Sequence, residues 1–171
     1  MTDIMQDSGD FALDLDRFDR AILAMLVADA RTSLADLAPK VGLSSTACAR
    51  RLKALEERGV ITGYHAALDH KRLGLAVTVL VRIALDSQRE EAFEAFERAV
   101  ARCASVIRCY FMSGYDDYEL LVLCRDIADF EHIHKTQLAR LPHVARIQSG
   151  FALRDVIDRG LPAALIAPTA R

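Results

Sequence analysis

Residues 42–64 read GLSSTACARRLKALEERGVITGY, and the order of turn, cap and helix signals in this stretch decides the fold of the N-terminal half. Ser44 is placed to cap a helix, and Gly59 is placed to end it after about Arg58. Within this predicted helix, three bases fall inside four positions: Arg50, Arg51 and Lys53.

The helical period divides these bases between two faces. At about 100° per residue from Cys48, Leu52 and Leu55 fall on the same side and form an apolar stripe. The opposite face carries Thr46, Ala49, Arg50, Lys53 and Glu57. Arg51 flanks the apolar stripe, so its predicted partner is either a DNA phosphate or an internal acid.

Two further helices precede this one. Apolar spacing predicts a first helix from Leu15 to about Asp29, and Ser33 begins a short second helix that ends at Gly42. A short helix, a turn with glycine and a longer helix form a helix-turn-helix, here at about Leu34 to Lys53.

The outward face of the longer helix suits a DNA major groove. Small residues allow close approach, Arg50 can donate twice to a guanine edge, and Lys53 can pair with a phosphate. The free N–H groups at the helix start can also hold a phosphate. The predicted DNA-binding residues are Ser44, Ser45, Thr46, Ala49, Arg50, Arg51 and Lys53.

The C-terminal half alternates strands and helices. Period-two and helical patterns predict strands at 76–85, 106–113, 118–125 and 144–154, and helices at 88–102 and 127–141. The order βαββαβ predicts a ferredoxin-like αβ-sandwich, and the fold class is α+β. One sheet face carries apolar residues without a helix, which predicts self-association.

These patterns divide the chain into five segments. We expect a disordered acidic tail at 1–13, a helix-turn-helix domain at 14–68 with a small wing at 60–69, and a linker at 69–75. A ligand-binding and oligomerisation domain follows at 76–160, and a loose tail occupies 161–171.

Composition excludes several classes of function. The 171 residues carry a net charge of −2, so positive charge is a local feature of the helix rather than a property of the whole chain. We expect a cytoplasmic protein, because there is neither a signal peptide nor a run of about 18 apolar residues. The four cysteines and five histidines match no metal pattern, so we expect no metal, no cofactor and no catalytic group.

With these features in place, the chain resembles the Lrp/AsnC family of transcription regulators. The resemblance rests on LDxxDxxIL at 15–23, the GLS turn at 42–44, Cys48 followed by arginine and a leucine seam, and GVITGY at 59–64. It covers roughly residues 15–160. It implies a regulator that binds double-stranded DNA, forms a homodimer through its C-terminal domain, and assembles further into an octamer or tetramer.

The same resemblance implies an amino acid or related small molecule as effector. The family's GxxDY signature matches Gly114, Asp117 and Tyr118. Glycine permits a close backbone approach, the acids of the loop can receive an ammonium group, and exposed N–H groups can receive a carboxylate. The predicted effector-binding residues are Ser113, Gly114, Tyr115, Asp116, Asp117, Tyr118, Gln148 and Ser149.

Two other functions compete with this prediction. Siroheme decarboxylase subunits share the two-domain plan, but the aromatic- and proline-rich features of their helix-turn-helix half are not found in SLADLAPKVGL at 33–43. His65 and His70 also lack a paired carboxylate at a spacing useful for catalysis. The second alternative is an amino-acid sensor that acts without DNA.

Overall fold

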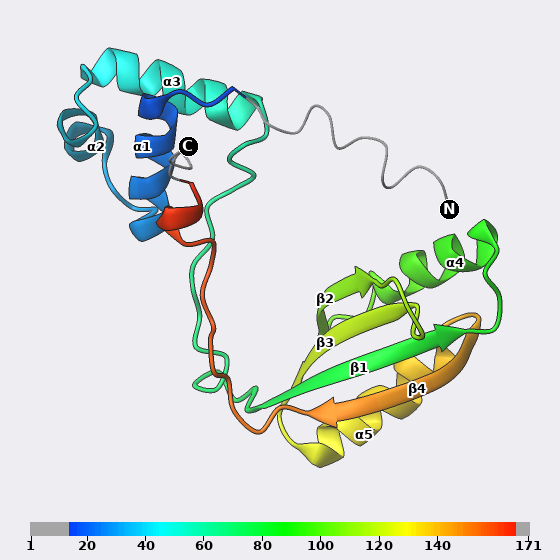
Figure 1. Ribbon diagram of the computed structural model, residues 1–171. Helices are drawn as coiled ribbons and strands as arrows, with labels where there is room; N and C mark the ends of the chain where they lie inside the picture. Colours follow the sequence, from blue (N-terminus) through cyan, green and yellow to red (C-terminus); the bar gives the residue numbers. More distant parts are fainter. Residues whose placement is uncertain (1–13, 167–171) are drawn as a thin grey trace. The chain divides into compact units, whose positions relative to one another are not determined.

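The computed structural model describes residues 14–166, in two compact units (Figure 1). Within the described residues, the first unit contains 14–67 and 157–166, and the second contains 68–156. The predicted tail at 1–13 and the last five residues of the predicted tail at 161–171 lie outside the described part of the chain.

The first unit is a bundle of three helices: α1 (Arg17–Ala28), α2 (Leu34–Lys40) and α3 (Ser45–Glu57). Their inward residues form one core around Ile22, Leu37, Cys48 and Leu55, each at most 1 % exposed. Cys48 and Leu55 belong to the apolar stripe that the helical period predicted for α3, and burial of one such stripe per helix accounts for the bundle.

Residues 60–69, predicted as a small wing, form no strand in the described structure. Val60 and Ile61 instead pack against the helical core, and an irregular segment follows. A wing needs two paired strands, and Gly63 lies within this segment, where it provides no side chain to pack in a strand.

The second unit is a four-stranded antiparallel sheet with two helices on one face (Figure 1). Its elements are β1 (Val77–Leu85), α4 (Glu90–Val100), β2 (Val106–Phe111), β3 (Tyr118–Cys124), α5 (Ile127–Thr136) and β4 (Val144–Phe151). The strand order β2-β3-β1-β4 is that of the predicted split βαββαβ fold. The predicted helix at 127–141 ends earlier, and a 3₁₀ turn, η1 (Leu138–Arg140), replaces its last turn.

The core of this unit lies between the sheet and the helices. Alternate residues of β1 and β3 are buried, and Phe96 of α4 and Phe130 of α5 pack against them. The other sheet face has no helix, and its side chains include Leu80, Tyr110 and Met112, each at least 40 % exposed. The predicted open apolar face is therefore present.

The segment predicted as a loose tail at 161–171 is partly ordered. After β4 the chain returns to the first unit, where η2 (Ala163–Leu165) contacts α1. The predicted limit of the C-terminal domain at residue 160 also differs, since residues 157–166 cluster with the helical unit. Sequence pattern missed this return because the segment is too short to show a period.

No helix in residues 14–166 is long and apolar enough to cross a membrane.

Candidate DNA-binding and effector-binding sites

The turn between α2 and α3 sets the direction of α3. Gly42 has a φ of 73°, and the amides of Gly42 and Leu43 donate to the carbonyl oxygens of Pro39 and Ala38. This Schellman pattern requires the left-handed conformation that glycine adopts without strain. Ser44 then caps α3, its hydroxyl accepting a hydrogen bond from the Ala47 amide at 3.3 Å.

Ser44 therefore already has a structural function as the cap. Ser45 and Thr46 follow it at the start of α3, and both are exposed. The first N–H groups of a helix lack partners within it, so this end of α3 presents free donors beside two exposed hydroxyl side chains. An anion such as a phosphate fits these donors.

The outward face of α3 carries free positive charge. Arg50 is exposed and makes no hydrogen bond or ion pair within residues 14–166. Lys53 lies 3.5 Å from Glu57 in a loose, highly exposed pair, which contributes little and exchanges readily with solvent. Ala49 between them is half-buried and small. In the described part of the chain, an arginine without a partner, a highly exposed ammonium and a small residue thus share one face.

Arg51 does not belong to this face. Its Nη1 atom lies 2.7 Å from Asp16 Oδ2 and 2.8 Å from Asp19 Oδ1, and its guanidinium also lies over the Phe18 ring. Of the two partners predicted for Arg51, the structure shows the internal acid within residues 14–166, and the assignment of Arg51 to DNA binding stays a prediction. The hydrogen bonds with Asp19 and Asp16 raise the pKa of Arg51.

Asp16 also caps α1. Its side chain accepts from the amides of Phe18 and Asp19, and Asp19 completes a capping box. The Asp19 amide, together with Arg51, holds the pKa of Asp16 below its ordinary value. One acidic pair therefore both starts α1 and fixes α3 against it.

The second candidate site is the loop between β2 and β3. Gly114 has a φ of 146°, a conformation that side chains rarely adopt, and a Cβ there would meet only open space. A cavity of about 190 Å³ lies at this loop. It is lined by five predicted residues, Ser113, Gly114, Tyr115, Asp116 and Tyr118, together with Arg82, Met112 and Glu119.

Asp117 stabilises the loop through hydrogen bonds to neighbouring residues. Its Oδ2 accepts from the Leu85 amide at 2.7 Å, and its Oδ1 accepts from the Gln88 side chain at 2.9 Å. These bonds attach the loop to the end of β1. Asp117 does not line the cavity, and both of its carboxylate oxygens already accept a hydrogen bond, so the predicted ammonium acceptor that lines the cavity is Asp116.

Arg146 of β4 is a residue that sequence reasoning missed. Its Nη2 donates to Asp116 Oδ1 and its Nη1 to the Tyr115 hydroxyl, both at 2.7 Å, and its guanidinium stacks over the Tyr115 ring. The hydrogen bonds with Tyr115 and Asp116 raise its pKa. Its buried Nε has no hydrogen-bond partner in the described part of the chain. Arg146 and Gln148 are two positions apart on one strand, so they share a face of the sheet. This spacing is the signal by which the sequence could have indicated Arg146.

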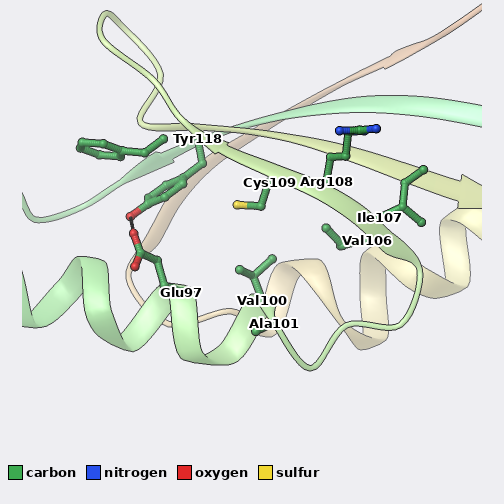
Figure 2. Close-up of a pocket in the computed structure, with 9 residues that line it drawn as sticks. Glu97, Val100, Ala101, Val106, Ile107, Arg108, Cys109 and Tyr118 are labelled. Carbon is green, nitrogen blue, oxygen red and sulfur yellow. Dashed lines mark hydrogen bonds between the residues drawn. The ribbon is translucent and has the colours of Figure 1, made fainter. Parts of the chain in front are cut away.

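Tyr118 is a core residue whose ring points away from the loop and toward α4 (Figure 2). It is 1 % exposed, and its hydroxyl donates to Glu97 Oε1 at 2.8 Å. Burial, followed by this carboxylate, raises the pKa of Tyr118 well above its ordinary value. Tyr118 therefore fixes the start of β3 beneath α4, and it also contributes to the lining of the loop cavity.

Figure 2 also shows a second hollow, of about 410 Å³, between α4 and β2. Five apolar side chains contribute to its lining, and Glu97, Arg108, Cys109 and Tyr118 add polar groups. Burial, with a smaller effect of Glu97, raises the pKa of the Cys109 thiol to about 11. The thiol consequently stays protonated and poorly nucleophilic at neutral pH.

The structure does not bring Gln148 and Ser149 together at the loop cavity. Gln148 pairs in register with Arg82 and Ser149 with Val81, and successive residues of a strand point to opposite faces. Gln148 therefore lies on the open face, and Ser149 lies on the helix-covered side at the sheet edge. Neither lines the cavity.

Each of the two units contains a region that matches the model of a known protein family. Residues 15–62 match the model of the winged helix-turn-helix DNA-binding domain, and residues 78–162 match the Lrp/AsnC ligand-binding domain. A proline dehydrogenase transcriptional activator of Rhodobacter capsulatus is 43 % identical over 148 residues, covering 86 % of this chain and 96 % of that protein.

Solved structures of transcription regulators have a fold similar to that of this chain. An AsnC family transcriptional regulator from Agrobacterium tumefaciens is 37 % identical with a TM-score of 0.82, over 89 % of this chain and 99 % of that one. A transcriptional regulator from Neisseria meningitidis, solved as a complex with L-methionine, is 29 % identical with a TM-score of 0.82, over 90 % and 99 % of the two chains.

The two units thus define a transcription regulator with a DNA-binding domain joined to a ligand-binding domain. The chain belongs to the Lrp/AsnC family of transcriptional regulators. It is a regulator and not an enzyme, and no comparison supports the decarboxylase alternative.

Proposed function

We propose that the outward face of α3 recognises a DNA sequence through Arg50. The observation that carries this proposal is that Arg50 is exposed and has no partner within residues 14–166, whereas Arg51, one position later, is held by two acids. Arg50 donates to a guanine edge, which gives specificity. Lys53 and the first N–H groups of α3 hold phosphates, which gives register and salt-dependent affinity.

Selection from a random duplex pool tests this function. The purified protein should enrich a pseudo-palindromic sequence and bind it at least about 10³-fold more tightly than unrelated DNA. Its affinity for the selected DNA should fall steeply with salt. Enrichment of no sequence would contradict a sequence-specific regulator, and would favour a sensor that acts without DNA.

We further propose that an amino acid binds at the β2–β3 loop. Support comes from the cavity at Gly114 and from the ion pair between Asp116 and Arg146 beside it. A zwitterion inserted into this pair satisfies both members, its ammonium accepted by Asp116 and its carboxylate by Arg146. The unpartnered Nε of Arg146 is a further donor for that carboxylate. The methionine complex of the Neisseria relative makes an apolar amino acid the first candidate.

We propose that the occupant of the open sheet face is a second copy of this chain. The face carries apolar side chains at positions that alternate with the core, and two such faces bury each other in a symmetric dimer. Two α3 helices then meet two half-sites on cytoplasmic DNA.

The dimer is also the proposed unit of a tetramer or octamer. An amino acid shifts the balance between such assemblies only if it binds them unequally. Regulation then follows from the different number of half-sites that each assembly presents.

A further inference from the structure

The open face of the sheet carries one polar row that crosses all four strands. Strand pairing places Tyr110 of β2 beside Glu119 of β3, and Glu119 beside Arg82 of β1. Arg82 in turn lies beside Gln148 of β4. Neighbours in register share a face of a sheet, and Arg82 and Glu119 alternate with the buried residues of their strands. The row therefore has its two charges on β3 and β1, the central strands of the sheet (Figure 1).

The contact between Arg82 and Glu119 uses little of the bonding capacity of this row. Arg82 Nε donates to Glu119 Oε2 at 3.3 Å, and the arginine side chain is 59 % exposed. Within residues 14–166, the two Nη atoms of Arg82 make no hydrogen bond, and neither do the Tyr110 hydroxyl and the side-chain amide of Gln148. An occupant of this face that offers these groups no partners would bury them at a cost, because each would lose its water.

The neighbouring row of the same face is mostly apolar. Arg108 of β2 is in register with Leu121 of β3. Leu80 of β1 lies beside Leu121 on one side and beside Gly150 of β4 on the other. The central strands thus carry a pair of leucines in one row and a pair of opposite charges in the next. An occupant of the face has to match both rows.

Twofold symmetry offers two ways to stack two copies of this face. An axis that runs across the strands, along the polar row, sets Arg82 over Arg82 of the second copy and Glu119 over Glu119. An axis that runs along the strands, between β1 and β3, exchanges the two central strands. Arg82 then faces Glu119 of the second copy, and Glu119 faces its Arg82. Like charges that face each other cost free energy, so charge selects the axis along the strands.

The axis along the strands also matches the other positions of the two rows. It sets Leu80 over Leu121 of the second copy, so that leucines pack on leucines. It sets Tyr110 over Gln148, whose side-chain amide both accepts and donates hydrogen bonds. Arg108 lies over a glycine, which leaves space for the long side chain. Aligned sheets keep their strands within about 30° of each other, so these central positions stay opposed.

We propose that Arg82 and Glu119 select a second copy of this chain as the partner of the open sheet face, by pairing crosswise about a twofold axis along β1 and β3. The proposal rests on the proposed dimer. Each charge gains a partner from the other copy, and the Nη atoms of Arg82 donate to the carboxylate of its Glu119. A related chain without opposite charges at these two positions is rejected, because a buried charge would lack its partner.

Charge reversal in the full chain tests this pairing. Both residues line the loop cavity, so no amino acid is added. Arg82→Glu makes the two positions acidic and Glu119→Arg makes them basic. Each should raise the dissociation constant of the dimer at least about 30-fold, as light scattering over a concentration series measures it. The double variant Arg82→Glu/Glu119→Arg restores opposite charges and should stay within about threefold of the wild type. The control is Arg102→Glu, a reversal at an exposed position outside the sheet, which should not change the dimer.

A mixture of the two single variants separates crosswise pairing from pairing within one chain. One variant is acidic at both positions and the other is basic, so opposite charges meet only between unlike copies. Native mass spectrometry of tagged Arg82→Glu with untagged Glu119→Arg should show mostly heterodimers. A contact that acts only within one chain gives no such preference, because neither variant can form it. Heterodimers no more frequent than random mixing gives would therefore overturn the proposal.

Two further outcomes separate this pairing from the dimer itself. A wild-type dimer that survives both single reversals would overturn the pairing and leave the proposed dimer intact. A wild type that stays monomeric at every concentration would contradict the dimer, and the pairing with it. If a reversal does not fold, Arg82→Gln and Glu119→Gln replace the reversals. Together they should weaken the dimer less than the sum of their separate effects, because no buried charge is left alone, and additive effects would overturn the pairing.

Discussion

Arg51 Nη1 lies 2.8 Å from Oδ1 of Asp19, whose side chain is the one buried charged group in residues 14–166. This pair joins α3 to α1 over 32 residues of sequence. It separates the two adjacent arginines of α3 into a structural residue and an exposed one, and each should respond differently to substitution.

Arg51→Ala should lower the free energy of unfolding by about 1–3 kcal/mol, because it leaves the Asp19 carboxylate buried without its donor. Urea denaturation followed by the helical circular dichroism signal measures this loss. The matched control is Arg50→Ala, a surface change one position earlier, which should stay within about 0.5 kcal/mol of the wild type. Equal losses in the two variants would contradict the structural function of Arg51.

Gly114→Trp should abolish the response to the effector and leave DNA binding measurable. The indole fills the loop cavity, and a side chain at φ 146° adds strain of about 1–3 kcal/mol. The wild type is first screened against the twenty amino acids by thermal shift. Gly114→Ala carries the strain without the bulk and should keep part of the shift. A full response in Gly114→Trp would mean that the effector binds elsewhere.

Tyr118→Phe separates structure from ligand binding at the same loop. Loss of the hydroxyl removes the hydrogen bond to Glu97, and we expect about 0.5–1.5 kcal/mol lower stability. The ligand-induced thermal shift should be unchanged, since the ring lies beneath α4. If the variant has normal stability but no longer responds to the amino acid, Tyr118 contacts the ligand and this prediction is wrong.

Leu80→Glu tests the dimer face. A carboxylate at this exposed position on the open sheet face would be buried in the interface. We therefore expect the dissociation constant of the dimer to rise at least about 30-fold. Light scattering after size-exclusion chromatography gives the mass as a function of concentration. Leu73→Glu, exposed in the turn before β1, is the control. A dimer of wild-type strength in Leu80→Glu would place the interface on another surface.

Much of this architecture could be predicted because it depends on local pattern. Ser44, Gly42 and Gly59 are cap and terminator residues whose conformations follow from their chemistry, and the structure places them at the ends of α2 and α3. The period-two alternation along 76–85 likewise predicted a strand, which β1 confirms.

The remaining features depend on contacts between distant residues. Asp116 and Arg146 are 30 residues apart, and Arg20 is 146 residues from Ile166, whose carbonyl oxygen accepts a hydrogen bond from it, so no local period reports either pair. Asp117 and Tyr118 fitted a ligand-binding signature, but a signature does not distinguish a side chain that contacts a ligand from one that supports the loop. In this structure both make scaffold contacts.

The central claim is that Arg50 reads DNA from the outward face of α3. Its most direct test is the affinity of Arg50→Ala for the selected operator and for unrelated DNA, by fluorescence anisotropy over a range of salt. Arg102→Ala, which removes the same charge from the exposed surface of the second unit, is the control. We predict that Arg50→Ala binds the operator about 1–3 kcal/mol more weakly, with relaxed sequence preference and unchanged stability. Operator affinity and preference equal to those of Arg102→Ala would contradict the account.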